Sequence, residues 1–481
     1  MKWTFSIRLS LLGLAVLILA ACGTASTPPV APAATTSAAS PMAATQASTT
    51  PSIASTAATN TPAPQATATA IVSPTTTTVL TATSRAAPTA ALTAATTVTR
   101  TAAATTVVTA TRAITATRAI TATAVATATK IAETPNPAAV PSVETFASGL
   151  DTPWAIAFAP DGRIFINERP GRIRVIKDGK LLAEPWMTLG VNEAGEAGLL
   201  GLALDPQFAQ NRYVYVAYTD RSPEGGLRNR LVRLREDPAT GKGVMDKVLI
   251  DNVPANTNHD GGRVKFGPDG KLYWTMGEAQ NMAAAQDLKT LSGKILRINP
   301  DGNIPSDNPI PGSPIYSYGH RNPQGLAWQP GTKRLYATEH GPSGEKGCCQ
   351  DEVNLIEPGK NYGWPTITGD QKKAGMVSPV IQSTTSETWA PTGATFVTSG
   401  PWQGSMLFTG LRGQTLYRLT LDPADPAKAK GLERLFAGQY GRLRDVAEGP
   451  DGAIYILTSN GDGRGNLPPN GDRVLRLTFA Q

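Results

Sequence analysis

The stretch Gly267-Pro268-Asp269-Gly270-Lys271-Leu272-Tyr273-Trp274 has two close copies elsewhere in the chain. Residues 159–166 read APDGRIFI, and residues 449–456 read GPDGAIYI. Proline presets the φ angle of a tight turn, and glycine accepts the positive φ that closes a hairpin. The residues after each turn are β-branched, aromatic or alternating, as in half-buried strands. The repeat therefore predicts several antiparallel hairpins of one kind.

Looser copies of this unit occur at residues 205–218, 329–338 and 404–419. Six units in about 335 residues average about 55 residues each, which suits blades of four short strands with some long loops. Convincing amphipathic helices are scarce. We therefore predict an all-β fold over residues 145–481, a six-bladed β-propeller of four-stranded antiparallel blades. A pair of β-sandwiches is the rival fold, but it does not explain the recurring turn.

The N-terminus has the features of a bacterial export signal. Lys2 and Arg8 give a positive start, and residues 9–19 are apolar but short for a membrane span. The run LAACG at residues 19–23 resembles the lipobox of bacterial lipoproteins, in which the cysteine, here Cys22, is lipidated. The alternative is an ordinary signal peptide with a chance cysteine. We expect a lipoprotein signal peptide over residues 1–22, and an exported protein that is attached to the membrane by lipid alone and faces the periplasm or the cell exterior.

Residues 23–144 form a linker that is dominated by Thr, Ala, Ser, Pro and Val. Between residues 26 and 141 it contains no aromatic residue and a single acid, Glu133. Such a segment cannot bury enough apolar surface to offset the entropy lost on ordering. We predict a disordered stalk, with O-glycosylation as an open question, that holds the propeller away from the membrane.

The net charge of +7 is concentrated in the N-terminal part of the chain. Residues 1–145 hold seven Lys or Arg and two acids, whereas the rest holds 37 basic and 35 acidic residues. The predicted propeller is therefore nearly neutral and offers no basic footprint for nucleic acid. The three cysteines, Cys22, Cys348 and Cys349, match neither a disulfide scaffold nor a zinc site.

The three histidines lie in loop-like segments rich in Gly, Asn, Asp and Pro. His259 lies in NHDGGR (residues 258–263), His320 in YGHRNPQG (residues 318–325) and His340 in EHGP (residues 339–342). A buried structural histidine would more often stand in an apolar strand. A three-histidine metal site is one interpretation, although these segments show no fixed ligand spacing.

These segments and several others together resemble one enzyme family. The others read GEAGLLG at residues 195–201, FGPDG at 266–270, DEVN at 351–354 and NYGWP at 361–365. The set is similar to that of the soluble quinoprotein glucose dehydrogenases and, more closely, of the bacterial aldose sugar dehydrogenases. The resemblance covers essentially residues 145–481. It implies a six-bladed propeller that binds pyrroloquinoline quinone (PQQ) and Ca²⁺.

The resemblance also implies roles for polar residues in these motifs. His259 is the expected general base, which takes the proton of the anomeric hydroxyl as hydride passes to the quinone, a role that suits an imidazole. Arg321 is expected to steady the charge that develops on the quinone oxygen. Asn322 and Glu196 are expected to hydrogen-bond the cofactor or the sugar.

A planar tricarboxylate such as PQQ calls for cationic partners with forked donors. Arg442 and Arg444 are spaced to project on the same side of an extended segment, where they can grip carboxylates. Arg412 stands where the family usually has Lys, which keeps the charge but changes the geometry. Thr388 is assigned to the cofactor site, whereas its neighbour Trp389 suits either the pocket mouth or the core.

Calcium in the family is held partly by main-chain carbonyls of a Gly-Pro pair, matched here by Gly341 and Pro342. Hard cations favour oxygen ligands of this kind, and a cation there polarises the quinone. Glu352 and Tyr362 align with a second, structural calcium site.

Two features depart from the glucose dehydrogenases proper. Asn258 precedes the histidine where those enzymes have Asp, which favours the aldose sugar dehydrogenase branch. Cys348 and Cys349 are adjacent in the loop before Asp351. Neighbouring Cα atoms lie about 3.8 Å apart, so a bridge between them is strained. Because an exported domain favours oxidation, we expect a vicinal disulfide there, with two free thiols as the alternative.

The sequence thus predicts an enzyme that uses PQQ and Ca²⁺ to oxidise aldose sugars to lactones and passes electrons to an external acceptor, a quinone or a cytochrome. A non-catalytic propeller that serves binding or adhesion is one alternative, and a metal-dependent lactonase is another. A lactonase needs carboxylates around a central metal, whereas Arg and His dominate this site. The family often forms homodimers, but the sequence leaves the oligomeric state, the preferred sugar and the acceptor open.

Overall fold

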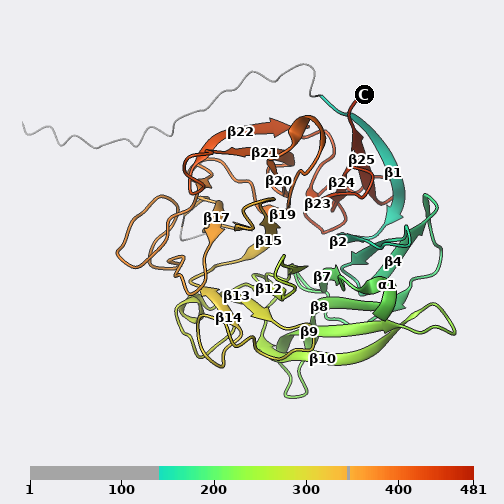
Figure 1. The fold of residues 1–481 in the computed structure, drawn as a ribbon, viewed down its shortest axis with the longest axis horizontal. Helices are drawn as coiled ribbons and strands as arrows, with labels where there is room; N and C mark the ends of the chain where they lie inside the picture. The colour runs from blue at the N-terminus through green and yellow to red at the C-terminus, as the bar shows by residue number, and fades with distance from the viewer. Residues whose placement is uncertain (1–139, 344–346, 481) are drawn as a thin grey trace, which may run out of the picture. The chain divides into compact units, whose positions relative to one another are not determined.

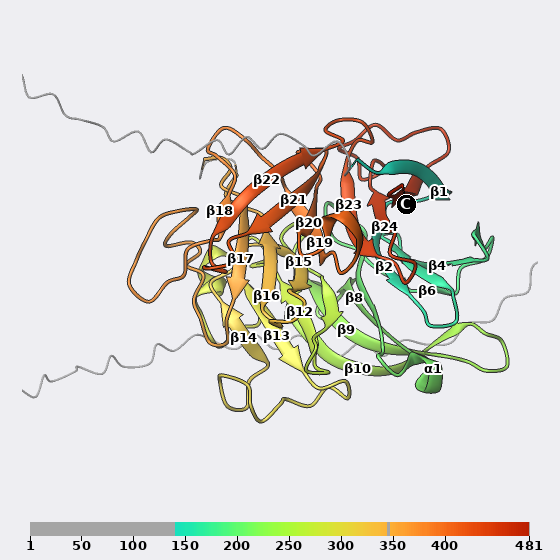
Figure 2. The ribbon, with the colours of Figure 1, turned by 45° about the horizontal axis from the view of Figure 1, so that its top comes forward.

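The structure, a computed structural model, describes residues 140–343 and 347–480. The predicted signal peptide, Cys22 and almost all of the predicted linker lie outside the described residues. The described chain is nearly all β, and its strands form six antiparallel sheets that follow one another around a ring (Figures 1 and 2). The predicted six-bladed β-propeller is therefore confirmed.

Each blade runs from an inner strand at the centre of the ring to an outer strand at its edge. Blade 1 holds β2 (Pro153–Phe158), β3 (Ile164–Glu168), β4 (Arg172–Lys177), β5 (Lys180–Leu181) and, also paired with β4, β6 (Met187–Thr188). Blade 2 holds β7 (Leu199–Leu204), β8 (Tyr213–Arg221), β9 (Leu227–Glu236) and β10 (Gly243–Pro254). Blade 3 holds β11 (Val264–Phe266), β12 (Leu272–Met276), β13 (Lys294–Ile298) and β14 (Ile315–Tyr318).

Blade 4 holds β15 (Pro323–Trp328), β16 (Leu335–Glu339), β17 (Glu352–Ile356) and β18 (Ile381–Gln382). Blade 5 holds β19 (Pro391–Phe396), β20 (Met406–Gly410), β21 (Thr415–Leu421) and β22 (Ala429–Leu435). Blade 6 holds β23 (Leu443–Glu448), β24 (Ile454–Thr458), β25 (Asp472–Thr478) and β1 (Ser142–Leu150). Short helical turns include α1 (Phe208–Asn211), η2 (Met282–Ala285) and η4 (Gly400–Trp402). In the described part of the chain, no helix has the length and hydrophobicity to cross a membrane.

The recurring Pro-Asp-Gly turn joins the first and second strands of blades 1, 3 and 6. In each copy the turn glycine donates its N–H to the carbonyl three residues earlier, and Gly162, Gly270 and Gly452 adopt φ angles of 85°, 72° and 74°. A side chain is disfavoured in this conformation, which explains the glycine. The looser copies fall in blades 2, 4 and 5, so the sequence repeat marks one blade each.

The inner strands are buried on both faces, and in this respect the expectation of half-buried strands was wrong. In β3, Phe165 packs toward blade 2, whereas Ile164 and Ile166 pack toward blade 6. The hydrophobic core is accordingly divided into six clusters, one between each pair of neighbouring blades. Because both faces of a blade are covered, its inner strands read as continuous apolar runs.

The ring is closed by the N-terminal strand. β1 pairs antiparallel with β25, so blade 6 combines one strand from the start of the described chain with three from its end (Figure 1). This strand begins at Ser142, inside the segment assigned from sequence to the linker. The three histidines lie in the loop that leaves β16 and in those that lead from β10 to β11 and from β14 to β15. The Pro-Asp-Gly turns connect the strands at their other ends.

Packing between blades predicts the cost of truncating one core side chain. Phe165 is fully buried and touches Trp186 and Phe208 edge-on at ring-centroid distances of 5.4 and 5.8 Å. We expect Phe165→Ala to lower the free energy of unfolding by about 3–5 kcal/mol. The control Leu182→Ala, at a site that is 40% exposed, should change it by less than about 0.5 kcal/mol. Denaturant unfolding of both variants measures this, and equal midpoints would contradict the packing described here.

Candidate active site

Loops from several blades enclose a cavity of about 270 Å³ beside the inner strands. Eleven of the residues singled out from sequence line it: Glu196, His259, Arg321, Gly341, Pro342, Cys348, Cys349, Thr388, Arg412, Arg442 and Arg444. Three others, Asn322, Glu352 and Tyr362, do not line it. The cavity also contains His340, named above only in the three-histidine metal interpretation, and polar residues that sequence reasoning gave no role, among them Arg169, Asp351, Asp462 and Arg464.

His259 is held by a carboxylate that the sequence analysis did not identify. Its Nδ1 lies 2.9 and 3.0 Å from the two carboxylate oxygens of Glu278, whose side chain is 1% exposed. A carboxylate can only accept there, so Nδ1 carries the proton and Nε2 is left as the basic nitrogen. Glu278 follows β12 closely and lies 19 residues from His259. A carboxylate at the end of a buried strand is the one sequence feature that could have pointed to it.

Glu196 joins three loops at the edge of the cavity. One oxygen accepts from the Nδ2 of Asn322 at 3.3 Å, and the other accepts from Nη1 of Arg464 at 3.0 Å. Burial alone raises the pKa of Glu196, but His340, His259 and Arg464 outweigh burial and the pKa lies below its ordinary value. Asn322 is fully buried and also accepts from the N–H of Gly261 at 3.0 Å. It therefore positions Glu196 and the His259 loop from behind the cavity.

Arg321 reaches the cavity from the loop between β14 and β15. Its Nη2 donates to Oγ of Ser343 at 3.0 Å, and its guanidinium lies 5.4 Å from the ring centre of Trp364. Burial lowers the pKa of Arg321, while the carboxylates of Glu278 and Glu196 act to raise it. The side chain is thus a largely desolvated cation beside the cavity, the setting in which a positive charge acts most strongly on a neighbouring oxygen.

The other two histidines differ sharply in their surroundings. His320 is fully buried, with Nδ1 2.8 Å from Glu339 and Nε2 2.9 Å from Oγ of Ser317, and it stacks on Tyr362. Both ring nitrogens are therefore used inside the protein, which removes His320 from the three-histidine metal interpretation. His340 lines the cavity, and its buried Nε2 has no hydrogen-bond partner among the described residues. Burial lowers the pKa of His340 to about 4, so this ring is neutral at pH 7.

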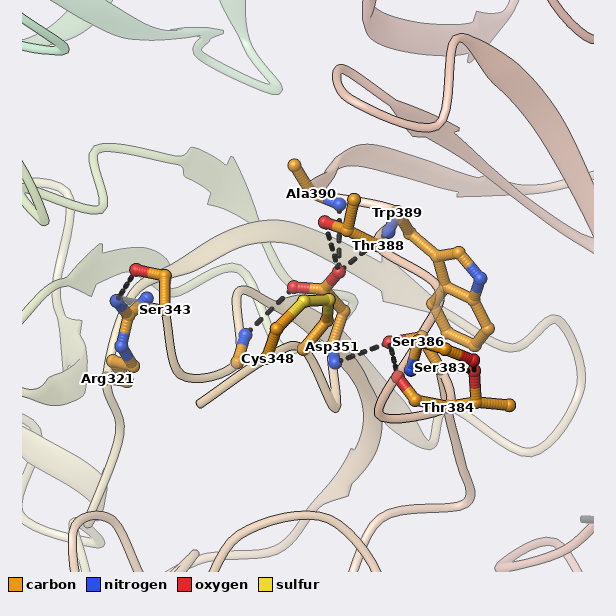
Figure 3. Close-up of a disulfide and its surroundings, with 12 residues drawn as sticks. Arg321, Ser343, Cys348, Asp351, Ser383, Thr384, Ser386, Thr388, Trp389 and Ala390 are labelled. Carbon is orange, nitrogen blue, oxygen red and sulfur yellow. Dashed lines mark hydrogen bonds between the residues drawn. A yellow bond between two sulfur atoms is a disulfide. The ribbon is translucent and has the colours of Figure 1, made fainter. Parts of the chain in front are cut away.

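Asp351 ties together two loops of the cavity wall (Figure 3). Its Oδ1 accepts from the N–H of Gly341 at 2.9 Å, and its Oδ2 accepts from the N–H of Trp389 and Ala390 at 2.7 and 3.0 Å. Thr388 donates its hydroxyl to the same Oδ2 at 3.2 Å. Trp389 itself is 1% exposed and packs with Phe408 and Tyr417, so of the two interpretations of Trp389 the structure favours core packing.

The cavity carries an excess of positive charge. Six arginines line it, against three carboxylates, which belong to Glu196, Asp351 and Asp462. Arg442 is paired with Asp462, whose Oδ2 lies 2.7 Å from Nε and 2.6 Å from Nη2. Arg444 is 2% exposed and donates to Oε1 of Gln324 at 2.8 Å, but no ion pair to it occurs within residues 140–343 and 347–480. Burial lowers the pKa of Arg444 to about 9.

This charge pattern fits the group that the resemblance implies. A buried guanidinium without a carboxylate partner is costly, and an anionic ligand would offset that cost. The excess of three positive charges matches the three carboxylates of PQQ. The exposed Arg412 stands at the same cavity and supplies one of these charges.

The two predicted calcium sites differ in their relation to the cavity. Gly341 and Pro342 line it, and their carbonyl oxygens accept no backbone hydrogen bond from any residue that the structure describes, which fits a hard cation. Glu352 lies behind the cavity, where its carboxylate accepts from Nδ2 of Asn354 at 3.0 Å and from the N–H of Gly369 at 2.9 Å. The hydroxyl of Tyr362 donates to the carbonyl of Leu355 at 2.6 Å. In the described ranges, no cluster of three or more His, Cys, Asp or Glu side chains is arranged to hold a metal ion.

Known proteins are similar to this chain in sequence and in fold. The family described as Glucose / Sorbosone dehydrogenase matches residues 150–468. Aldose sugar dehydrogenase YliI from Escherichia coli is 34% identical over 354 residues, which cover 68% of this chain and 92% of YliI.

Two solved structures also match. A protein from Thermus thermophilus, provisionally assigned as a glucose dehydrogenase, is 47% identical with a TM-score of 0.65, and the match covers 70% of this chain and 100% of that one. The PQQ-bound aldose sugar dehydrogenase from Streptomyces coelicolor is 39% identical with a TM-score of 0.63, over 71% of this chain and 98% of that one. The family match spans most of the propeller, including every cavity residue named above. The chain therefore belongs to the glucose/sorbosone dehydrogenase family of oxidoreductases.

Proposed function

We propose that this protein is a PQQ- and Ca²⁺-dependent dehydrogenase that oxidises the anomeric carbon of aldose sugars to give lactones. The observation that carries the proposal is the arrangement of the cavity. A histidine polarised by a buried carboxylate faces a pocket whose arginines outnumber its carboxylates by six to three. The three carboxylates of the cofactor would offset the excess of arginines, and the sugar would be an uncharged second ligand.

His259 is the proposed general base. With Nδ1–H held by Glu278, Nε2 is the nitrogen that can take the proton of the anomeric hydroxyl. Glu278 then stabilises the imidazolium that forms, and it keeps the ring in one orientation. PQQ, when bound, supplies the carbon that accepts the hydride from the sugar. The proton thus leaves the anomeric hydroxyl, and the hydride leaves the carbon that carries this hydroxyl.

The remaining polar residues bind and orient. Arg321 places a desolvated cation where it can stabilise negative charge on a bound oxygen. Glu196, ionised and fixed by Asn322 and Arg464, offers an acceptor for a sugar hydroxyl next to His259. Arg442, Arg444 and Arg412 would hold cofactor carboxylates, and the carbonyls of Gly341 and Pro342 would hold Ca²⁺.

The alternative of a metal-dependent lactonase finds less support in this geometry. Such an enzyme needs carboxylates that turn toward a central metal. Here the carboxylate of Asp462 faces Arg442, that of Glu196 faces Arg464 and Asn322, and that of Asp351 accepts from three backbone N–H groups and a hydroxyl.

The cellular setting is part of the same proposal. A lipid on Cys22 and the long linker would hold the enzyme beside the membrane, where a quinone or a cytochrome can accept its electrons. The support for this is the sequence of residues 1–144. The stalk length gives the propeller reach along the membrane surface without fixing its orientation.

Replacing the base tests the chemistry. In the chain loaded with PQQ and Ca²⁺, we expect His259→Gln to lower kcat for aldose-dependent dye reduction about 10²- to 10⁴-fold, with PQQ affinity nearly unchanged. Glu278→Gln should also lower kcat, because a side-chain amide can donate to Nδ1 and so favour the tautomer that protonates Nε2. Full turnover by His259→Gln would rule out this base.

Replacing the buried arginine tests the cofactor site. We expect Arg444→Met to weaken PQQ binding roughly 10- to 100-fold, because a charge-assisted hydrogen bond is lost. The same variant should keep or raise the melting temperature of the cofactor-free chain, because a buried unpaired charge is removed. Fluorescence titration and thermal unfolding measure the two effects.

Two controls frame this experiment. Arg412→Lys restores the residue usual in the family and should bind PQQ almost normally. Arg476→Met removes a 29% exposed arginine on β25 that pairs with Asp451, outside the cavity lining, and it should leave PQQ affinity unchanged. Parental PQQ affinity in Arg444→Met would contradict the assignment of this arginine to the cofactor.

A further inference from the structure

The loop between β16 and β17 carries a vicinal disulfide on the cavity wall. The structure joins Cys348 to Cys349, and both line the cavity together with Gly341 and Pro342 from the start of the same loop. Cys349 is 2% exposed, whereas Cys348 is exposed. Figure 3 shows this disulfide and Asp351 in the same part of the cavity wall. No role assigned so far to the cavity uses this disulfide.

The backbone of Cys349 sets the position of Gly341. A Cβ atom added to Gly341 would lie 1.9 Å from the carbonyl oxygen of Cys349 and 2.3 Å from that of Gln350. These contacts are with backbone, which cannot swing away as a flexible side chain can. Gly341 is therefore glycine because the two halves of the loop touch main chain to main chain. A shift of the Cys349–Gln350 peptide unit, which directly follows the disulfide ring, would therefore displace Gly341.

Asp351 fixes the loop on the other side of the disulfide. It accepts the N–H of Gly341 at 2.9 Å, and its second oxygen is held by the N–H of Trp389 and Ala390. The backbone N–H of Asp351 in turn donates to Oγ of Ser383 at 2.9 Å. Gly341 is thus held between an anchored carboxylate and the backbone of residues 349–350. The disulfide closes a small covalent ring that restrains the backbone between the Cα atoms of Cys348 and Cys349, directly before the carbonyl of Cys349 that faces Gly341.

We propose that the Cys348–Cys349 disulfide is a positioning element for the Gly341–Pro342 carbonyl pair, so that Ca²⁺ affinity depends on the oxidation state of the two sulfurs. This inference rests on the proposed function, in which that carbonyl pair holds Ca²⁺. Groups behind metal ligands commonly change metal affinity 10- to 100-fold when they are altered. The disulfide stands in that relation to the carbonyl of Gly341, through the contact with the Cys349 backbone.

The test is to reduce the disulfide, with a phosphine as the reductant. The phosphine breaks the S–S bond and, with one water, becomes the phosphine oxide, while the two electrons and two protons yield the Cys348 and Cys349 thiols. The full chain is stripped of metal with a chelator, and peptide mapping first establishes the disulfide. Ca²⁺ is then titrated by calorimetry into the oxidised and the reduced chain, with no PQQ present.

We expect reduction to weaken the Ca²⁺ site about 10- to 100-fold. Cys348→Ser/Cys349→Ser should have the weakened affinity from the outset and should not respond to the phosphine. Repeating the titrations in Glu352→Gln identifies any heat that comes from the second predicted calcium site. A change confined to that second site would overturn the inference.

Thermal unfolding separates positioning from general stabilisation. A disulfide that merely stabilises the fold would lower the melting temperature equally with chelator and with Ca²⁺. Ca²⁺ raises the melting temperature by an amount that depends on its affinity. If the disulfide positions the site, this rise is smaller in the reduced chain than in the oxidised chain. Equal Ca²⁺ affinities in the oxidised and reduced chains, or free thiols in the protein as exported, would overturn the inference alone. A failure of the oxidised chain to bind Ca²⁺ at all would overturn both the inference and the metal part of the proposed function.

Discussion

Packing of each blade against two neighbours is the constraint on which the rest of this molecule depends. The inner strands have no solvent-facing side, so the side chains on both of their faces pack against a neighbouring blade, and a closed ring of sheets provides this packing. Closure is completed by the pairing of β1 with β25, which places the first strand of the described chain at the outer edge of blade 6. The loops above the inner strands are therefore carried on a rigid base.

Charge is buried where the inner strands of several blades meet. Arg263 and Asp445 form an ion pair at 2.9 Å with side chains that are 1% and 3% exposed, and Arg263 lies 4.3 Å from the ring centre of Trp154. The carboxylate of Asp445 also accepts the N–H of Ile156 at 3.1 Å, so the pair links blades 1, 3 and 6. Arg444 directly precedes Asp445 and lacks such a partner among the described residues. An arginine paired with a carboxylate thus adjoins one that has no such partner among the described residues, and the second is the one that reaches the cavity.

Much of this architecture could be predicted from the sequence because it rests on local patterns. The Pro-Asp-Gly turns marked the blades, and the spacing of Arg442 and Arg444 pointed both side chains into one cavity. Contacts between distant segments could not be predicted in this way. Arg464 meets Glu196 only because different blades bring their loops together, and Glu278 meets His259 only once β11 and β12 of blade 3 pair in register. Motif membership also proved a poor guide to exposure, since His320, next to Arg321, is wholly enclosed by Ser317, Glu339 and Tyr362.

In the proposed reaction, a sugar reduces a quinone bound in this cavity while His259 takes the proton. The most direct measurement mixes the chain loaded with PQQ and Ca²⁺ with a neutral aldose, without any external electron acceptor, and follows the absorbance of the cofactor. We expect a panel of neutral aldoses to contain at least one that fully reduces the bound cofactor within a single turnover. An unchanged spectrum with every aldose at saturating concentration, while the cofactor stays bound, would contradict it.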